Sequence, residues 1–199
     1  MSEKFFPFDS IQKDRVYKSS DFAEYYKNLI TDGLYHDNGK VGLNIKEINN
    51  LAITFDGGMA FIEGRQYINT EDIVLQGTIA EDNMFRRDLV VLRMDTRLNE
   101  RSIKLKFIEG EPSLTEEGAI LPSITRDENV FDLGLYSVLF RPQATSILKN
   151  DIVDLRGDLR YCQLSNPRGF GGSSIFRGPQ EPPKMFVKAG DIWMDELGD

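Results

Sequence analysis

Residues 87–107, RDLVVLRMDTRLNERSIKLKF, are the stretch that decides the fold class. The uninterrupted apolar run at 89–92 predicts a strand that lies in the core. Polar residues follow at 95–99, and the strict alternation at 103–107 then predicts a strand with one solvated face. Two such strands joined by a short polar segment indicate an antiparallel hairpin.

The segments on either side of this hairpin also carry strand signals. Alternation at 51–55, the turn residues Asp56-Gly57-Gly58 and an apolar run at 59–62 predict another hairpin. Residues 132–140 predict a further strand with a bulge at Gly134, and the polar residues 151–159 predict a turn-like segment that closes the folded part.

These signals together predict a mainly β fold. We expect an antiparallel β-sandwich or curved meander, with one N-terminal α-helix and extended N- and C-terminal arms. No alternation of strands with helices is visible, which argues against a doubly wound nucleotide-binding fold.

The helix is expected from Asp21, where apolar residues begin to recur with helical spacing. Asp21 and Glu24 form a plausible capping pair, and Gly33 is a natural end. We favour packing of the apolar stripe against the chain's own sheet, with contact to another subunit as the alternative. The stripe consists of Phe22, Tyr25, Tyr26, Leu29 and Ile30.

Both ends of the chain carry aromatic clusters. Phe5, Phe6 and Phe8 surround Pro7, which favours an extended strip whose rings are buried on another subunit. A Gly/Pro-rich connector follows residue 164, and apolar residues then return at Phe186, Ile192 and Trp193. Docking of this second cluster on a partner and folding back onto the domain are both open.

The chain therefore divides into three expected parts. Residues 1–46 form the arm and helix, 47–164 the antiparallel β domain, and 165–199 the connector with its docking segment. A chain of 199 residues with 40% apolar content has enough material for one core.

Charge and composition exclude several function classes. The net charge is −8, from 32 acidic and 24 basic residues, and the basic residues form no cluster longer than a pair, so nucleic acid is not an expected partner. No apolar stretch approaches 18 residues and no basic-then-apolar leader is present, so neither a membrane span nor a signal peptide is expected. The single cysteine, Cys162, excludes an internal disulfide and a thiolate zinc site.

Residues for catalysis or metal binding do not form a recognisable pattern. His36 is the only histidine and lies in a turn-like segment without a nucleophile motif. Asp151, Asp154 and Asp158 lack the spacing of a calcium loop, and we expect them to form ion pairs with Arg156 or Arg160. The glycines at 169–172 have no following lysine and are expected to form a linker. We therefore expect no enzyme activity, metal or cofactor.

Six short motifs, in this order along the chain, carry a resemblance to a known family. They are Phe6-Pro7-Phe8-Asp9-Ser10, Asp14-Arg15-Val16-Tyr17, GMAFIEGRQY at 58–67, RDLVVLRMD at 87–95, LPSITR at 121–126 and DIVDLR at 151–156. Over about residues 5–162 the chain resembles the attachment module of tail and baseplate proteins from phages of Gram-positive bacteria. Larger members of that family add a C-terminal receptor-binding or fibre domain, and we expect this protein to act without one.

The resemblance implies a non-enzymatic virion protein of the tail or baseplate, an adaptor that docks other tail proteins and is assembled in the host cytoplasm. It also implies a homo-oligomer, with a trimer preferred. A small binder of host polysaccharide is the alternative, with loops around Tyr35 or 131–136 facing outward. A glycosidase has less support, because no pair of catalytic acids is identifiable. The expected partner-binding residues are Phe5, Phe6, Phe8, Phe22, Tyr25, Tyr26, Phe186, Ile192 and Trp193.

Overall fold

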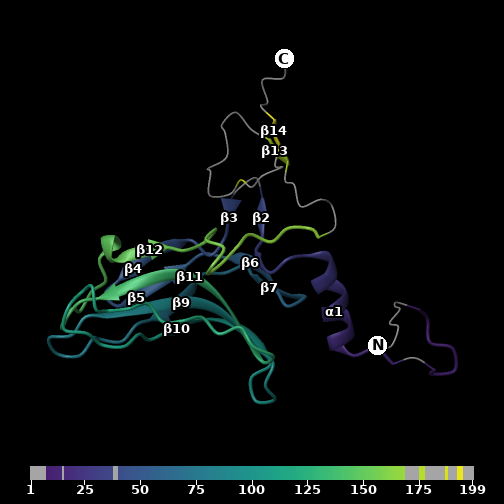
Figure 1. The fold of residues 1–199 in the computed structure, drawn as a ribbon, viewed down its shortest axis with the longest axis horizontal. Helices are drawn as coiled ribbons and strands as arrows, with labels where there is room; N and C mark the ends of the chain where they lie inside the picture. The colour runs from purple at the N-terminus through teal and green to yellow at the C-terminus, as the bar shows by residue number, and fades with distance from the viewer. Residues whose placement is uncertain are drawn as a thin grey trace.

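The computed structural model describes residues 8–14, 16–37, 40–168, 175–177, 187 and 192–194. The fold is mainly β, with several antiparallel sheets and the single α-helix α1 in the described residues, as the sequence predicts (Figure 1). In chain order the elements are α1 (Ser19–Leu29), β1 (Gly33–Leu34), β2 (His36–Asp37), β3 (Lys40–Val41), β4 (Ile45–Asn49), β5 (Ala52–Phe55), β6 (Gly58–Ile62), β7 (Arg65–Asn69), β8 (Ile73–Gln76), β9 (Arg86–Asp95), β10 (Ser102–Ile108), β11 (Val130–Phe140), the 3-10 turn η1 (Lys149–Asp151), β12 (Ile152–Asp154), β13 (Ile175–Arg177) and β14 (Ile192–Met194).

The central sheet has the strand order β10-β9-β11-β12 and is antiparallel throughout. Leu92 of β9 pairs with Leu105 on one side and with Leu133 on the other, and all three side chains are buried. The hairpin predicted from residues 87–107 is therefore confirmed as β9 and β10.

Strand β11 contains a bulge, which shifts the alternation of its side chains by one residue. Gly134 pairs with Val91 and Tyr136 pairs with Val90, so Leu135 is the extra residue. Leu133 and Tyr136 consequently both belong to the main core, and the Tyr136 hydroxyl donates to the carbonyl oxygen of Leu43 at 2.9 Å. The bulge predicted at Gly134 is confirmed.

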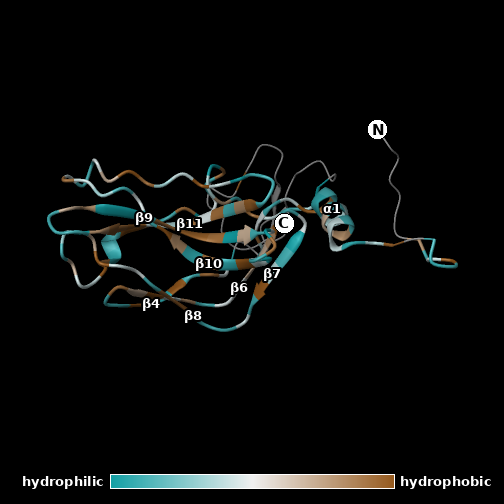
Figure 2. Cartoon of the chain, turned by 90° about the horizontal axis from the view of Figure 1, so that it is seen from below, coloured by the Kyte–Doolittle hydropathy of each residue, from teal (hydrophilic) through white to brown (hydrophobic). Residues whose placement is uncertain are grey.

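Two smaller sheets, β4-β5-β8 and β1-β6-β7, cover one face of the central sheet. Figure 2 shows β4 and β8 as a layer apart from β9, β10 and β11. The core between the layers includes Ile53 and Phe55 from β5, Ile62 from β6 and Val90 from β9, each fully buried. This layered arrangement of antiparallel sheets corresponds to the first of the two predicted architectures, a sandwich or a curved meander.

The second face of β9 is covered by irregular chain. Leu89 and Val91 are fully buried although they do not belong to the main core. The segment between β10 and β11 lies over this end of the strand, where Arg87 Nε donates to the carbonyl oxygen of Ala119 at 3.1 Å. Burial on both faces explains the unbroken apolar run at 89–92.

The hairpin predicted at 51–62 is wrong, because β5 and β6 belong to different sheets. A Cβ atom on Gly57 would lie 2.7 Å from the carbonyl oxygen of Asn69, and one on Gly58 would lie 2.8 Å from the backbone nitrogen of Leu43. The glycines therefore permit close backbone approach where the chain crosses between sheets, and they do not form a hairpin turn.

The actual hairpins in this region are β4–β5 and β6–β7. Glu63 and Gly64, between β6 and β7, have φ of 49° and 71°. Two successive residues with positive φ are typical of the tight turns that match the twist of antiparallel strands.

Other boundaries also differ from the predicted ones. Strands β1 to β3 precede residue 46, so the β structure begins inside the predicted arm and helix. The segment 151–159 is not only turn-like, since β12 pairs with the edge of β11. The short run 163–168 is tied to 29–34, with the Leu34 N–H donating to the Gln163 carbonyl at 3.0 Å.

Candidate partner-binding surface

Helix α1 begins two residues before the predicted start. Asp21 is not the cap itself: its carboxylate accepts a hydrogen bond from the backbone N–H of Lys18 at 2.7 Å, within the first turn. The helix ends at Leu29, because Ile30 adopts an extended conformation and forms a β-bridge with Pro167. The helix therefore ends before Gly33, the stop that the sequence predicts.

Helix α1 contacts its own domain on the side that carries Ala23. Ala23 is the only buried residue of α1, and it lies against the turn at Gly64. A Cβ atom on Gly64 would come 1.8 Å from the Ala23 carbonyl oxygen, which no side chain could tolerate. Lys27 forms an ion pair with Glu63, and Glu63 N–H donates to Asp32 Oδ1 at 2.5 Å. These contacts fix the orientation of the helix.

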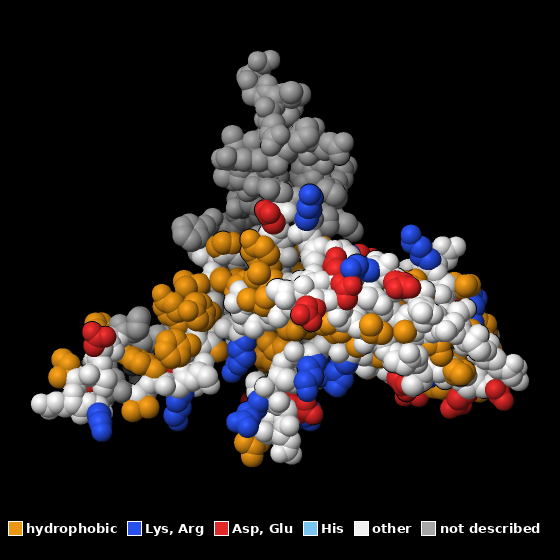
Figure 3. All heavy atoms as spheres, turned by 180° about the vertical axis from the view of Figure 1, so that it is seen from behind, with side chains coloured by type: hydrophobic (Ala, Val, Ile, Leu, Met, Phe, Trp, Pro, Cys, Tyr) orange, Lys and Arg blue, Asp and Glu red, His pale blue; other side chains and the backbone are white. Residues whose placement is uncertain are grey.

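This orientation turns the apolar stripe of α1 away from the domain. Phe22, Tyr25, Tyr26 and Leu29 have exposed fractions of 49%, 39%, 46% and 44%. The favoured interpretation, that the stripe packs on the chain's own sheet, is therefore wrong. Figure 3 shows apolar side chains gathered over α1. We call these four residues the α1 face.

The arm before α1 adds apolar area beside the α1 face. Phe8, Ile11 and Val16 are 58%, 73% and 80% exposed. Tyr17 connects the arm to the helix: its hydroxyl accepts from the Phe8 N–H at 3.0 Å, and its ring lies edge-on to Phe22 with centroids 6.1 Å apart. Arm and α1 face thus form a continuous apolar region at one end of the molecule.

The structure brings four of the nine expected contact residues together: Phe8, Phe22, Tyr25 and Tyr26. Phe5, Phe6 and Phe186 lie outside the described residues. Ile192 and Trp193 lie in β14, whose backbone pairs in parallel with β13, away from α1 in Figure 1. In a single chain, the backbone of β14 therefore does not lie beside α1.

Sequence reasoning missed the contacts that orient the helix and the exposed residues of the arm. Ala23 and Gly64 are 41 residues apart in the sequence, and nothing in either segment indicates that they touch. The one available signal is the small side chain of Ala23 on the side of α1 that flanks the aromatic stripe, since small residues permit close approach of two backbones.

The acidic residues that might have suggested calcium form ion pairs. Asp154 pairs with Arg156 and Asp158 pairs with Arg160, as predicted, whereas Asp151 pairs with Arg141 instead. Within the part of the chain that the structure describes, no group of three histidine, cysteine or acidic side chains is arranged to hold a metal ion.

Other candidate residues for chemistry or sugar binding are dispersed. His36 lies half-buried in β2, and among the described residues its Nδ1 has no hydrogen-bond partner. Tyr35 is 46% exposed, but the expectation that 131–136 faces outward is wrong, because this segment belongs to β11 and Tyr136 is 3% exposed. Cys162 is buried, which raises the pKa of its thiol to about 12 and makes it a poor nucleophile.

The comparisons with known proteins add no assignment. No model of a known protein family matches the chain, and no curated protein matches it. Among the described residues, none of the helices combines the length and hydrophobicity that a membrane crossing requires.

Proposed function

We propose that this chain is a non-enzymatic structural adaptor of a phage tail or baseplate, which docks other virion proteins through the α1 face. The observation that supports docking most directly is the outward orientation of this face. An amphipathic surface helix normally places its apolar stripe on its own core, and here the four side chains of the α1 face are 39–49% exposed. The tail or baseplate assignment depends on the sequence resemblance.

The energetic argument follows from the exposed area. Full burial of a large apolar side chain contributes about 1.5–3 kcal/mol, so the half-exposed side chains of the α1 face each have roughly 1 kcal/mol still to gain. Aromatic residues are also the typical anchors at the centres of protein interfaces. A partner that covers the face and the arm would bury a continuous apolar region.

The test is a triple substitution of the α1 face, F22A/Y25A/Y26A, in the producing host. Incorporation of the variant into particles should fail, whereas the domain should stay folded, because each of these half-exposed side chains contributes only about 1 kcal/mol of burial within the chain. The matched control replaces the exposed apolar residues Leu98 and Leu114 by Ala, outside the α1 face. Normal incorporation of the triple variant would reject the α1 face as the docking surface.

We also propose that the adaptor is a symmetric homo-oligomer, with a trimer preferred by the resemblance. Identical copies with apolar regions at an end can bury them against one another or against a shared ring. Native mass spectrometry of the full chain, alone and released from particles, measures the copy number. Monomer in both samples would reject this part of the proposal.

A further inference from the structure

A second surface feature lies beside α1 and differs from the α1 face in its chemistry. It is a cleft of about 390 Å³ whose lining includes Ser19 at the start of α1, Arg65 of β7, Asp95 and Thr96 at the end of β9, and Arg101 and Ser102 at the start of β10. We call it the Arg65–Arg101 cleft. Four elements, α1, β7, β9 and β10, therefore supply polar side chains to one hollow.

Two guanidinium groups give this cleft its positive charge. Arg65 Nη1 donates to the Glu63 carbonyl at 3.2 Å, which holds the side chain in place and leaves its other donors for a ligand. The exposed Arg101 side chain makes no hydrogen bond or ion pair within the described residues. Figure 3 shows Lys and Arg side chains gathered around the projecting end of β9 and β10.

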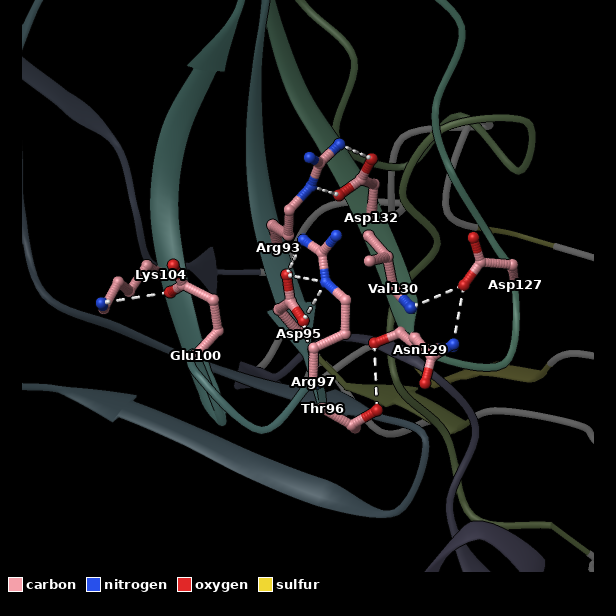
Figure 4. A network of polar contacts seen from close by, with 10 residues as sticks. All are labelled: Arg93, Asp95, Thr96, Arg97, Glu100, Lys104, Asp127, Asn129, Val130 and Asp132. Carbon is pink, nitrogen blue, oxygen red and sulfur yellow. Dashed lines mark hydrogen bonds and ion pairs between the residues drawn. The ribbon is translucent and has the colours of Figure 1, made fainter.

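The acidic residue in the lining does not cancel this charge. Arg97 Nε donates to both carboxylate oxygens of Asp95, at 2.9 and 3.0 Å, and Figure 4 shows this pair beside the ion pair of Arg93 and Asp132. Asp95 is thus already neutralised by a third guanidinium. The cleft keeps the charges of Arg65 and Arg101 in a chain whose net charge is −8.

We propose that the Arg65–Arg101 cleft binds carboxylate side chains, and that its occupant is the acidic segment 195–199 of a second copy of this chain. Guanidinium groups match carboxylates with paired hydrogen bonds, and the hydroxyl groups of Ser19 and Ser102 can donate to the same oxygens. The segment DELGD supplies Asp195, Glu196 and Asp199 within five residues. The complementarity of charge is the reason for choosing this occupant.

The position of β14 favours a second copy over the chain's own segment. In Figure 1, β14 lies above β2 and β3, away from α1 and β7, whose residues Ser19 and Arg65 line the cleft. Five extended residues after Met194 span at most about 17 Å. A contact between one copy's cleft and another copy's acidic segment is heterologous, and such contacts generate rings when the rotation closes.

The experiment measures binding of a fluorescently labelled peptide of residues 191–199 by anisotropy. The full-length chain with D195N/E196Q/D199N is the receptor, so that its own carboxylates do not compete. We expect R101Q to weaken binding about tenfold, because hydrogen bonds to charged groups contribute about 1.5–3 kcal/mol. R65Q/R101Q should weaken it further. K106Q, with the same charge change at an exposed position of β10, is the control and should leave affinity unchanged.

Four outcomes would overturn the proposal. The first is no binding of the peptide to the receptor, and the second is equal affinity for wild-type and R101Q receptors. The third is equal binding of a scrambled acidic peptide, which would exclude this segment as the specific occupant. The fourth is an unchanged oligomeric mass of the full-length D195N/E196Q/D199N chain, which would exclude the second copy. Substitution of Tyr26 should not alter peptide affinity, so the result is independent of the α1 face.

Discussion

Replacement of Gly64 by Ala should detach α1 from the domain. Gly64 has a φ of 71°, and an added Cβ would lie 1.8 Å from the carbonyl oxygen of Ala23. The backbone of residue 64 fixes the position of the added Cβ, and the atom that it meets is a backbone oxygen, so a rotamer change cannot relieve the contact. Either the β6–β7 turn or the helix must move, and α1 is the element with the fewer contacts to lose.

The magnitude combines three contributions. A left-handed conformation costs a residue other than glycine about 1–2 kcal/mol, loss of Ala23 burial costs about 1 kcal/mol, and loss of the exposed Lys27–Glu63 pair costs between about 0 and 1 kcal/mol. We therefore expect a total of about 2–4 kcal/mol, most of it seen as local opening of the helix. The β sheets should keep their stability, because their core lies elsewhere.

Hydrogen exchange measured by mass spectrometry on peptides that cover residues 19–29 is the assay. Protection of these amides should fall in the Gly64→Ala variant, while peptides from β9 and β11 exchange as in the wild type. Gly64→Asn separates the two causes, since asparagine tolerates positive φ but still carries a Cβ. Gly157→Ala, at another glycine with positive φ, is the control and should leave α1 protected. Wild-type protection of α1 in both Gly64 variants would refute the proposed attachment of the helix.

Three further predictions concern the core and its charges. Asp88→Ala should cost about 3–5 kcal/mol in urea unfolding, because it leaves the buried Arg86 guanidinium without the carboxylate that it contacts at 2.8 Å. The double variant R86L/D88L should lose less stability than the sum of the losses in R86L and D88L. Additive costs would show that the pair is not coupled. Leu92→Ala, at a fully buried central position, should cost about 2–5 kcal/mol by the same assay, and a loss below 1 kcal/mol would contradict its place in the core. A hydrogen bond from the Arg97 side chain lowers the pKa of Asp95 from 3.8 to about 2. The stability that the ionised Asp95 contributes is therefore present above pH 3.8 and is lost as the pH falls toward 2. Asp95→Asn should therefore flatten the acid dependence of Tm over this interval, and an unchanged dependence would contradict the pairing.

The strands could be predicted from the sequence where burial leaves a local pattern. The continuous apolar run at 89–92 reports a strand covered on both faces, and the alternation at 103–107 reports an edge strand with one wet face. The bulge at Gly134 was also predictable, because a glycine inside a strand pattern often marks one.

The point at which the chain passes from the sheet of β5 to the sheet of β6 could not be predicted from a local pattern. Gly57 and Gly58 are suited both to a turn and to close backbone approach, and the choice is decided by residues 42–44 and 69. The orientation of α1 had the same difficulty, since its apolar stripe is equally regular whether it faces the core or solvent. The Arg65–Arg101 cleft joins residues 36 positions apart, which no local pattern connects.

The most direct test of docking through the α1 face is photo-crosslinking from Tyr26 in assembling particles. Incorporation of p-benzoylphenylalanine at this exposed aromatic position preserves its character and reports only on proteins in contact with it. We expect a crosslink to another virion protein or to a second copy of this chain, and none from the same probe at the exposed Leu114. Absence of any crosslink from Tyr26 in particles that have incorporated the protein would contradict the central claim.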